Sequence, residues 1–360
     1  MNKIHKIISL VILMTMLLPN MTASAGNDDR RGTAGAGELL INPWARSAGW
    51  ANVNTANGSG LDALFTNVAG LGHATGTDFY FNYSHYLNDS DMGIIALGIA
   101  QNLGDFGVLG LYVNSMSFGK IQKTTYYAPE VTGASFKPTL MNLGVSFAKA
   151  FSSSIYAGVT LKVINEGIDN VTATGVAFDA GIQYVTGDDY EIKFGIALKN
   201  WGPSMSFSGD GLSTMSTVEN ADHQQTLEQR SLSWELPSSL NIGASYDFLF
   251  AEKEHRLTVA GNYESMAFAK DLYTAGLEYG FKKLFMIRCG YTYQGGGTKD
   301  IYTNTDRTNF SNGFTAGATI NATIVKGKGN KRSTDLSIDY AYRTTVILGG
   351  IHSIGVRLTL

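Results

Sequence analysis

The residue types that perform catalysis or bind metals are few in this sequence and poorly placed for either task. Cys289 is the single cysteine, and no histidine stands at metal-ligand spacing from it or from another histidine. Ser84 precedes His85, but adjacent strand residues point to opposite faces, so the two do not form a nucleophile–base pair. The acidic run 88–91 could bind calcium, but it has the composition of a turn. We expect no catalytic site, metal or cofactor; a hydrolase built across strands is the alternative.

Charged side chains offer a second kind of chemistry, because they recur opposite the apolar stripes of several segments. If these segments line a lumen, side chains of both signs either pair with one another or select the solute that passes. The mixture of signs and a formal net charge of -3 favour pairing in a packed interior. The candidate lumen charges are Lys162, Asp179, Lys193, Glu278, Arg288, Asp339 and Arg357.

Strands with two unlike faces are needed to position these charges. In residues 141–148 apolar side chains alternate with small or polar ones, which is the period of a β-strand. The same alternation predicts fourteen strands, most of them near the length of about 9–11 residues that crosses a bilayer. The predicted strands are 77–86, 91–102, 106–118, 139–151, 155–166, 173–186, 190–204, 237–249, 255–266, 271–281, 284–294, 312–324, 334–344 and 350–360.

The composition favours strands that border a nonaqueous phase. Of the 360 residues 44% are hydrophobic and only 16% are charged, where about 25% is usual, and 42 are glycines. Because the two charge signs nearly balance, no basic surface is available for nucleic acid. We therefore expect an all-β membrane protein whose outer face contacts the lipid of the outer membrane.

Residues 1–25 have the form of a secretory signal peptide. Lys3 and Lys6 precede the short apolar run 7–18, and residues 23–25 (Ala-Ser-Ala) match the cleavage pattern. The run is shorter than the roughly 20 residues of a spanning helix. We expect export to the outer membrane, and an N-terminal membrane anchor is the alternative.

The connections and the chain end predict that residues 77–360 close into an antiparallel transmembrane β-barrel. Short turns follow alternate strands, whereas the connections 119–138, 205–236 and 295–311 are long. Outer-membrane barrels have this asymmetry, with short turns on the periplasmic side. The last strand reaches Leu360, so it can pair with the first strand.

Residues 26–76 lack the alternation of a barrel strand. This segment is rich in small residues but contains Trp44, Trp50 and Phe65, which would be exposed to water outside a folded environment. We therefore predict a plug inside the lumen, with a disordered tail as the alternative. The predicted organisation is a signal peptide (1–25), a plug (26–76) and a barrel (77–360).

Two motifs in the plug carry a family resemblance. They are 45–49 (Ala-Arg-Ser-Ala-Gly) and 62–71 (Asp-Ala-Leu-Phe-Thr-Asn-Val-Ala-Gly-Leu). With these motifs and with 178–184, 199–203 and 339–342, the chain resembles the PorV/PorQ family of outer-membrane proteins of the type IX secretion system. That family is itself similar to the FadL hydrocarbon transporters. The resemblance implies a fourteen-stranded barrel with an N-terminal hatch. The hatch residues that it implies are Arg46, Asn67 and Gly70.

The resemblance implies one of two functions. A PorV-like protein would dock or shuttle exported proteins, with secretion-system proteins or their cargo as partners, and the sequence favours this function. A FadL-like protein would transport hydrophobic small molecules and would hold a hydrophobic ligand or detergent in its lumen. Two long connections contain apolar side chains that suit a protein partner, although a lid over the lumen is the alternative. These candidate docking residues are Tyr126, Tyr127, Phe136, Phe207, Met215 and Trp234.

Overall fold

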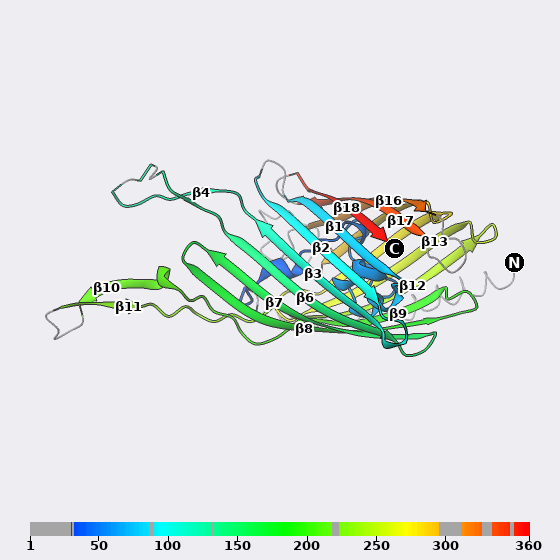
Figure 1. The fold of residues 1–360 in the computed structure, drawn as a ribbon, viewed down its shortest axis with the longest axis horizontal. Helices are drawn as coiled ribbons and strands as arrows, with labels where there is room; N and C mark the ends of the chain where they lie inside the picture. Colours follow the sequence, from blue (N-terminus) through cyan, green and yellow to red (C-terminus); the bar gives the residue numbers. More distant parts are fainter. Residues whose placement is uncertain are drawn as a thin grey trace.

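The computed structural model describes residues 30, 32–86, 90–127, 129–130, 133–217, 223–294, 311–325, 333–345 and 349–360. The predicted signal peptide, 1–25, lies outside these residues. Fourteen strands form a closed antiparallel barrel in the order β1-β18-β17-β16-β15-β14-β13-β12-β9-β8-β7-β6-β3-β2 (Figure 1). The predicted fold, a closed all-β barrel preceded by an N-terminal segment, is confirmed.

All fourteen predicted wall strands are present, with small shifts at their ends. They are β1 (Thr77–Tyr86), β2 (Gly93–Asn102), β3 (Val108–Ser117), β6 (Thr139–Ala150), β7 (Ile155–Ile168), β8 (Val171–Thr186), β9 (Ile192–Trp201), β12 (Ser239–Phe250), β13 (His255–Met266), β14 (Leu272–Phe281), β15 (Phe285–Gln294), β16 (Ser311–Val325), β17 (Thr334–Thr345) and β18 (Ile351–Thr359). Two hairpins that the sequence did not predict lie in the long connections. They are β4 (Ile121–Gln122) with β5 (Ser135–Phe136), and β10 (Ser213–Thr217) with β11 (Gln224–Glu228).

The wall closes because the last strand pairs with the first. β18 pairs with β17 on one side and with β1 on the other. In the β1–β18 pair, Asn82 lies opposite Gly355 and Ser84 opposite Ser353, so residues of the inward face meet each other. Each wall strand therefore has two neighbours, and its backbone groups are paired without help from water.

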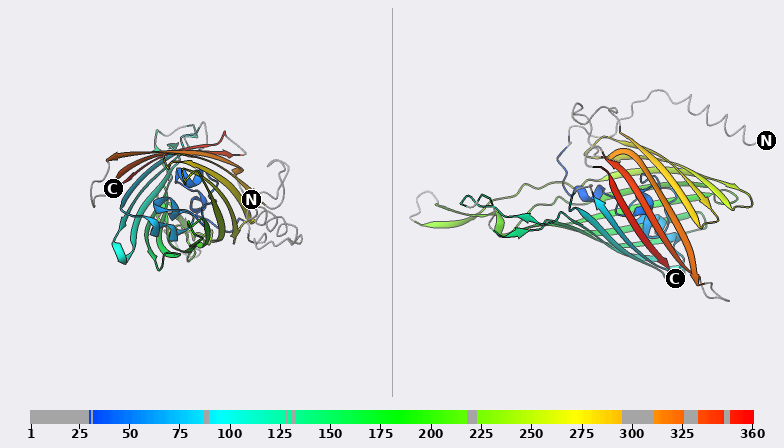
Figure 2. Two further views of the ribbon diagram at one scale, coloured as in Figure 1. Left: turned by 90° about the vertical axis from the view of Figure 1, so that its right-hand side faces the viewer. Right: turned by 90° about the horizontal axis from the view of Figure 1, so that it is seen from above.

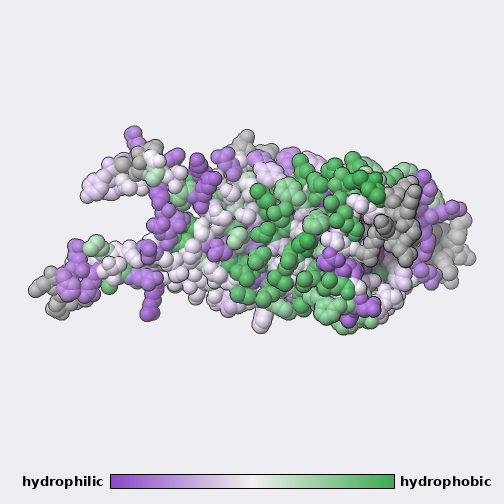
Figure 3. Space-filling model, in the orientation of Figure 1, coloured by the Kyte–Doolittle hydropathy of each residue, from purple (hydrophilic) through white to green (hydrophobic). Residues whose placement is uncertain are grey.

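The two ends of the barrel differ. Short turns and the C-terminus lie at one end, and the two hairpins project from the other (Figures 1 and 2). Between the ends, outward side chains such as Leu97, Ile196 and Ile242 are exposed, and a band of apolar residues covers the wall in Figure 3. Because outer-membrane barrels have short periplasmic turns, we assign the hairpin end to the cell exterior.

The N-terminal segment from residue 32 to 76 runs inside the wall (Figure 2, left). Its short helices are η2 (Gly37–Leu40), α2 (Ala45–Ala48), η3 (Gly60–Leu64) and η4 (Val68–His73). Two further turns of 3-10 helix are η5 (Gly104–Phe106) and η6 (Asp210–Leu212). Among the described residues, no helix combines the length and the apolar character needed to cross a membrane.

Glycines of the wall allow this segment, called the plug below, to approach the strands closely. A Cβ at Gly195 of β9 would lie 2.3 Å from the carbonyl oxygen of Thr55. A Cβ at Gly158 of β7 would lie 2.8 Å from the carbonyl oxygen of Val68. Larger residues at these positions would displace the plug, so part of the high glycine content serves plug packing.

Candidate functional site

Aromatic and aliphatic side chains fix the plug inside the barrel. Trp44 stacks on Tyr80 of β1, with ring centroids 5.0 Å apart and planes inclined by 11°. Leu61 and Leu71 belong to the same buried cluster. Trp50 lies in a smaller buried cluster that joins the plug to β13. Both tryptophans that motivated the plug prediction are thus buried in the lumen.

Asn67 holds the plug by hydrogen bonds from both ends of its amide. Its Oδ1 accepts from the backbone N–H of Ala69 (3.1 Å) and so caps η4. Its Nδ2 donates to the carbonyl oxygens of Thr55 (2.9 Å) and of Ile182 on β8 (3.0 Å). At Gly70, a Cβ would lie 2.2 Å from the carbonyl oxygen of Gly58, which is also in the plug. These residues determine the local fold of the plug and its contact with the wall.

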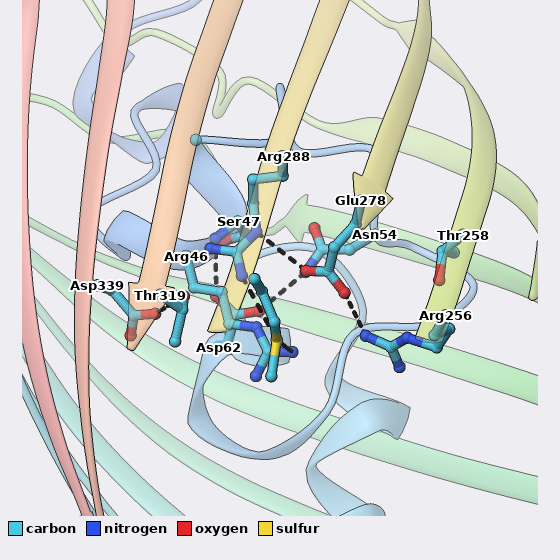
Figure 4. A network of polar contacts seen from close by, with 12 residues as sticks. Arg46, Ser47, Asn54, Asp62, Arg256, Thr258, Glu278, Arg288, Thr319 and Asp339 are labelled. Atoms are coloured by element: carbon cyan, nitrogen blue, oxygen red, sulfur yellow. Dashed lines mark hydrogen bonds and ion pairs between the residues drawn. The ribbon is translucent and has the colours of Figure 1, made fainter. Parts of the chain in front are cut away.

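An ion-pair network lies where the plug meets β13, β14 and β15 (Figure 4). Glu278 of β14 accepts a hydrogen bond from Nε of Arg288 (3.0 Å) and also pairs with Arg256. The side chains of Glu278 and Arg288 are both almost fully buried. Figure 4 shows Arg46 and Asp62 of the plug beside this cluster. The plug therefore meets the wall at charged groups as well as at apolar ones.

Carboxylates of the wall and of the plug keep Arg46 charged. Burial alone lowers the pKa of a guanidinium, but Glu278, Asp62 and Asp339 outweigh this effect and raise the pKa of Arg46 above its ordinary value. Burial raises the pKa of Asp62, while Arg46 and Arg357 oppose the rise. Asp62 also accepts a hydrogen bond from the backbone N–H of Ser47 (2.9 Å), which orients the plug turn that carries Arg46.

Replacing Glu278 by alanine is expected to lower the free energy of unfolding by about 3–5 kcal/mol, because buried Arg288 would lose its carboxylate. Equilibrium unfolding of the reconstituted protein in guanidinium chloride, followed by tryptophan fluorescence, measures the change. The control is Glu191→Ala, which removes a carboxylate from a periplasmic turn. Equal stabilities of the two variants would contradict the structural role of the network.

The remaining predicted lumen charges also point inward and have polar partners. The contacts join opposite charges, or a charge and a hydroxyl, so these predicted lumen charges do not form a region of one sign that would select ions. This arrangement agrees with a packed interior. The contacts are Lys162–Asp179 (2.6 Å), Lys193–Asp247 (2.6 Å), Tyr80–Asp339 (2.8 Å) and Arg357–Ser337 (3.5 Å).

A cavity of about 330 Å³ lies in the outer half of the lumen. Its apolar lining comes from the plug, from strand ends and from the β13–β14 connection, and includes Leu40, Ile41, Met266, Ala269, Leu272 and Ile351. Lys199 and Glu264 form a 3.5 Å ion pair on its wall, and Nζ of Lys199 lies 4.4 Å from the ring centroid of Phe65. We call this space the outer cavity.

A second cavity, of about 320 Å³, lies nearer the periplasmic turns and is lined mainly by polar groups. We call it the inner cavity. Its charged lining residues are Arg46, Asp62, Lys193, Arg256 and Glu278, with His73 beside them. The plug segment 46–54 contributes residues to both cavities and lies between them.

The dividing segment 46–54 contains two residues with a left-handed backbone. Ala51 has a φ of 53° and Asn52 a φ of 60°. This conformation costs a residue with a side chain about 1–2 kcal/mol. Asn42 holds the turn, because its Nδ2 lies 2.7 Å from Oδ1 of Asn52 and 2.6 Å from Oγ of Ser47. The sequence reasoning missed Asn42; the only signal was the cluster of asparagines, a residue type that accepts left-handed φ values.

The candidate docking residues separate into two groups. Tyr126 and Tyr127 lie in the loop that joins β4 to β5 and are 92% and 94% exposed. Phe136 pairs with Ile121 in that hairpin. Met215 of β10 is 69% exposed. This group projects from the outer end of the barrel.

Phe207 and Trp234 form the second group and face the plug. Their ring centroids are 4.9 Å apart, and a Cβ at Gly35 would lie 2.0 Å from the Trp234 ring. The backbone of Ala34 forms an isolated bridge with Glu235. The start of the plug is therefore attached to the long 202–238 connection at the outer mouth.

Comparison with solved structures relates the fold to outer-membrane channels. A mutant of TodX described as a monoaromatic hydrocarbon channel overlays with a TM-score of 0.50 at 13% identity, covering 87% of this chain and 96% of that chain. The toluene transporter TodX of Pseudomonas putida gives a TM-score of 0.50 at 12% identity, covering 88% of this chain and 97% of that chain. No protein-family model and no curated protein matches the sequence. The chain thus has the fold of a fourteen-stranded outer-membrane β-barrel of the kind seen in TodX.

Proposed function

We propose that this protein passes hydrophobic small molecules across the outer membrane. The observation that carries the proposal is the outer cavity of about 330 Å³, whose lining combines apolar side chains with polar ones such as Asn262, Thr292 and Arg343 and suits a small, largely apolar ligand. The similar structures of TodX are described as hydrocarbon channels or as a toluene transporter. Likeness of fold is weak evidence of function by itself. The chemistry of the cavity supplies the independent support.

In this proposal the plug segment 46–54 is the barrier. A ligand in the outer cavity contacts Ala48, Ala51 and Asn52, whereas the polar inner cavity lies beyond them. Passage requires this segment to move. The left-handed backbone of Ala51 and Asn52 reduces the cost of that movement, because leaving the conformation releases strain.

Filling the outer cavity is expected to slow uptake several-fold. Thr292 of β15 faces the cavity, so Thr292→Trp places an indole there. The matched control is Tyr293→Trp, at the next residue, which faces outward. The measurement is uptake of radiolabelled toluene by cells that lack the gene and carry each variant. Equal uptake by all cells, including those without the protein, would overturn the proposed function.

A second candidate function is docking of secreted proteins, as the resemblance to the PorV/PorQ family implies. The supporting observation is that both hairpins extend beyond the outer end of the barrel and carry exposed Tyr126, Tyr127 and Met215. An isolated two-stranded hairpin is marginally stable in water. A partner that packs on β10 and β11 would stabilise it.

Shortening residues 208–232 to a Gly-Ser link distinguishes the two functions. The change removes the β10–β11 hairpin but keeps Phe207 and Trp234, so the contact of the connection with the plug survives. If the chain is a channel, toluene uptake persists. If it docks exported proteins, co-purification of partners and export of their cargo are lost, whereas a channel without this role leaves both unchanged.

A further inference from the structure

Arg343 of β17 lies at the outer cavity, in a row of residues that crosses neighbouring strands of the wall. In the strand register, Arg343 is opposite Ile351 of β18 on one side and opposite Thr315 of β16 on the other. Ile351 is in turn opposite Tyr86 of β1. All of these residues line the outer cavity. The guanidinium of Arg343 is therefore placed among neighbours that carry no opposite charge.

Two nitrogens of the Arg343 side chain have no acceptor among the residues that the structure describes. Nε and Nη2 are both shielded from solvent and donate no hydrogen bond. Nη1 is not among the shielded atoms, so a molecule in the cavity can approach the guanidinium there. A buried charge without a partner is costly, because it has lost its water and gained no counter-charge in exchange.

The other charged residues of the cavity lining do not compensate Arg343. They are Lys199 and Glu264, which form a 3.5 Å ion pair and so cancel each other. Oε1 of Glu264 also accepts hydrogen bonds from Oγ of Ser239 (2.7 Å) and Nδ2 of Asn241 (3.2 Å), which hold it near β12. In the wall, β14, β15 and β16 separate the strand of Glu264 from the strand of Arg343. Among its described lining residues, the outer cavity therefore has one uncompensated positive charge.

The rest of the lining suits a compact apolar body. Leu40 and Ile41 of the plug face it from one side, and Met266 and Leu272 from the β13–β14 connection. Phe65 adds an aromatic ring. Thioether groups such as that of methionine make favourable contacts with aromatic rings. The ligand that matches both features of the cavity is a small ring that carries one negative charge.

We propose that the outer cavity binds a compact aromatic carboxylate, whose anionic group pairs with Arg343 while its ring lies against the apolar lining. The inference rests on the proposed function, because it names a further class of compound for the same cavity. A guanidinium and a carboxylate match in charge and in hydrogen-bond geometry. An uncharged molecule of the same shape leaves Arg343 without a counter-charge. The cavity therefore prefers the anion to its neutral isostere.

The test compares benzoate with benzamide, which has nearly the same shape and no charge. Isothermal titration calorimetry of the purified full-length protein in an uncharged detergent measures both affinities. We expect benzoate to bind at least ~10-fold more tightly than benzamide, because only benzoate forms a charge-assisted pair with Arg343. Equal affinities for the two compounds would overturn the proposal.

Substitutions of Arg343 assign the effect to its charge. Arg343→Met should weaken benzoate binding at least ~10-fold and change benzamide binding little. Arg343→Lys keeps the charge and should restore part of the benzoate affinity. The control Arg230→Met removes an exposed guanidinium from the long connection after β11. Unchanged benzoate affinity in Arg343→Met, or loss of benzoate binding in Lys199→Met alone, would place the anion elsewhere and overturn the proposal.

Thermal unfolding keeps the result independent of folding defects. Without ligand, Arg343→Met is expected to have a higher transition temperature than the wild-type protein, because it removes an unpaired buried charge. Benzoate should raise the transition temperature of the wild-type protein and not that of the variant. A lower transition temperature for the ligand-free variant would show that Arg343 already has an anionic partner in the chain, and would overturn the proposal.

Uptake by cells separates this inference from the proposed function. If toluene uptake requires the protein but benzoate affinity does not depend on Arg343, the inference alone fails. If the purified protein binds benzoate through Arg343 but cells with and without the protein take up toluene and benzoate equally, the inference stands and the proposed function fails.

Discussion

A chain that lacks β18 (Ile351–Thr359) is expected to be absent from the outer membrane as a folded barrel. Without β18, both β1 and β17 lose a pairing partner along their full length. Unpaired backbone groups in lipid cost several kcal/mol each, so an open wall has no stable arrangement in the bilayer. The measurement is heat-modifiable migration of the protein in isolated outer membranes.

A point substitution tests the same strand without shortening it. Val356 of β18 faces outward into the apolar band. Val356→Arg places a charge on this lipid-facing surface, where a charged side chain near the bilayer midplane lowers the stability of a barrel by about 2–4 kcal/mol. The amount of folded barrel should fall strongly. The control Val356→Ile keeps an apolar side chain at the position and should accumulate normally. Normal levels of the arginine variant would show that this face does not contact lipid.

Removal of the plug is expected to convert a closed barrel into a steady ion-conducting pore. The plug occupies the lumen, and its segment 46–54 divides the outer cavity from the inner cavity. Deletion of residues 32–72 would leave a fourteen-stranded wall whose lumen is lined by charged and polar side chains, which water enters. Single-channel recording in planar bilayers should show little conductance for the wild-type protein and large, ohmic steps for the deletion variant.

A full-length variant tests the role of the plug without depending on correct folding of the shortened chain. Gly158→Leu introduces a side chain where a Cβ already approaches the carbonyl oxygen of Val68 to 2.8 Å, so it pushes the plug from the wall. Gly167→Leu is the matched control on the same strand, because a Cβ at Gly167 has no neighbour closer than 3.9 Å. We expect intermittent conductance from Gly158→Leu alone. A conducting wild-type protein, or a silent deletion variant that folds, would contradict the role of the plug.

The wall could be predicted from the sequence to within a few residues, because strand alternation is a local property. Residues such as Leu143 and Val145 face lipid while Asn142 and Ser146 face the lumen, and this pattern is readable without knowing the neighbouring strand. The β4–β5 and β10–β11 hairpins were missed. Both faces of such a hairpin meet solvent, so no apolar alternation marks it.

Contacts between distant parts of the chain could not be predicted from the sequence. Tyr80 donates to Asp339 only because β18 closes the wall beside β1. Partnerships of the lumen charges depend in the same way on strand register.

The sequence alone thus determined the number of wall strands, their two faces and the closure of the chain end. The tertiary structure decided where the plug lies and which charges pair. The physical reason is the distance along the chain over which each effect acts. Alternation between lipid and lumen acts on each residue separately, whereas a cavity or an ion pair requires side chains that are brought together only when the barrel closes around the plug.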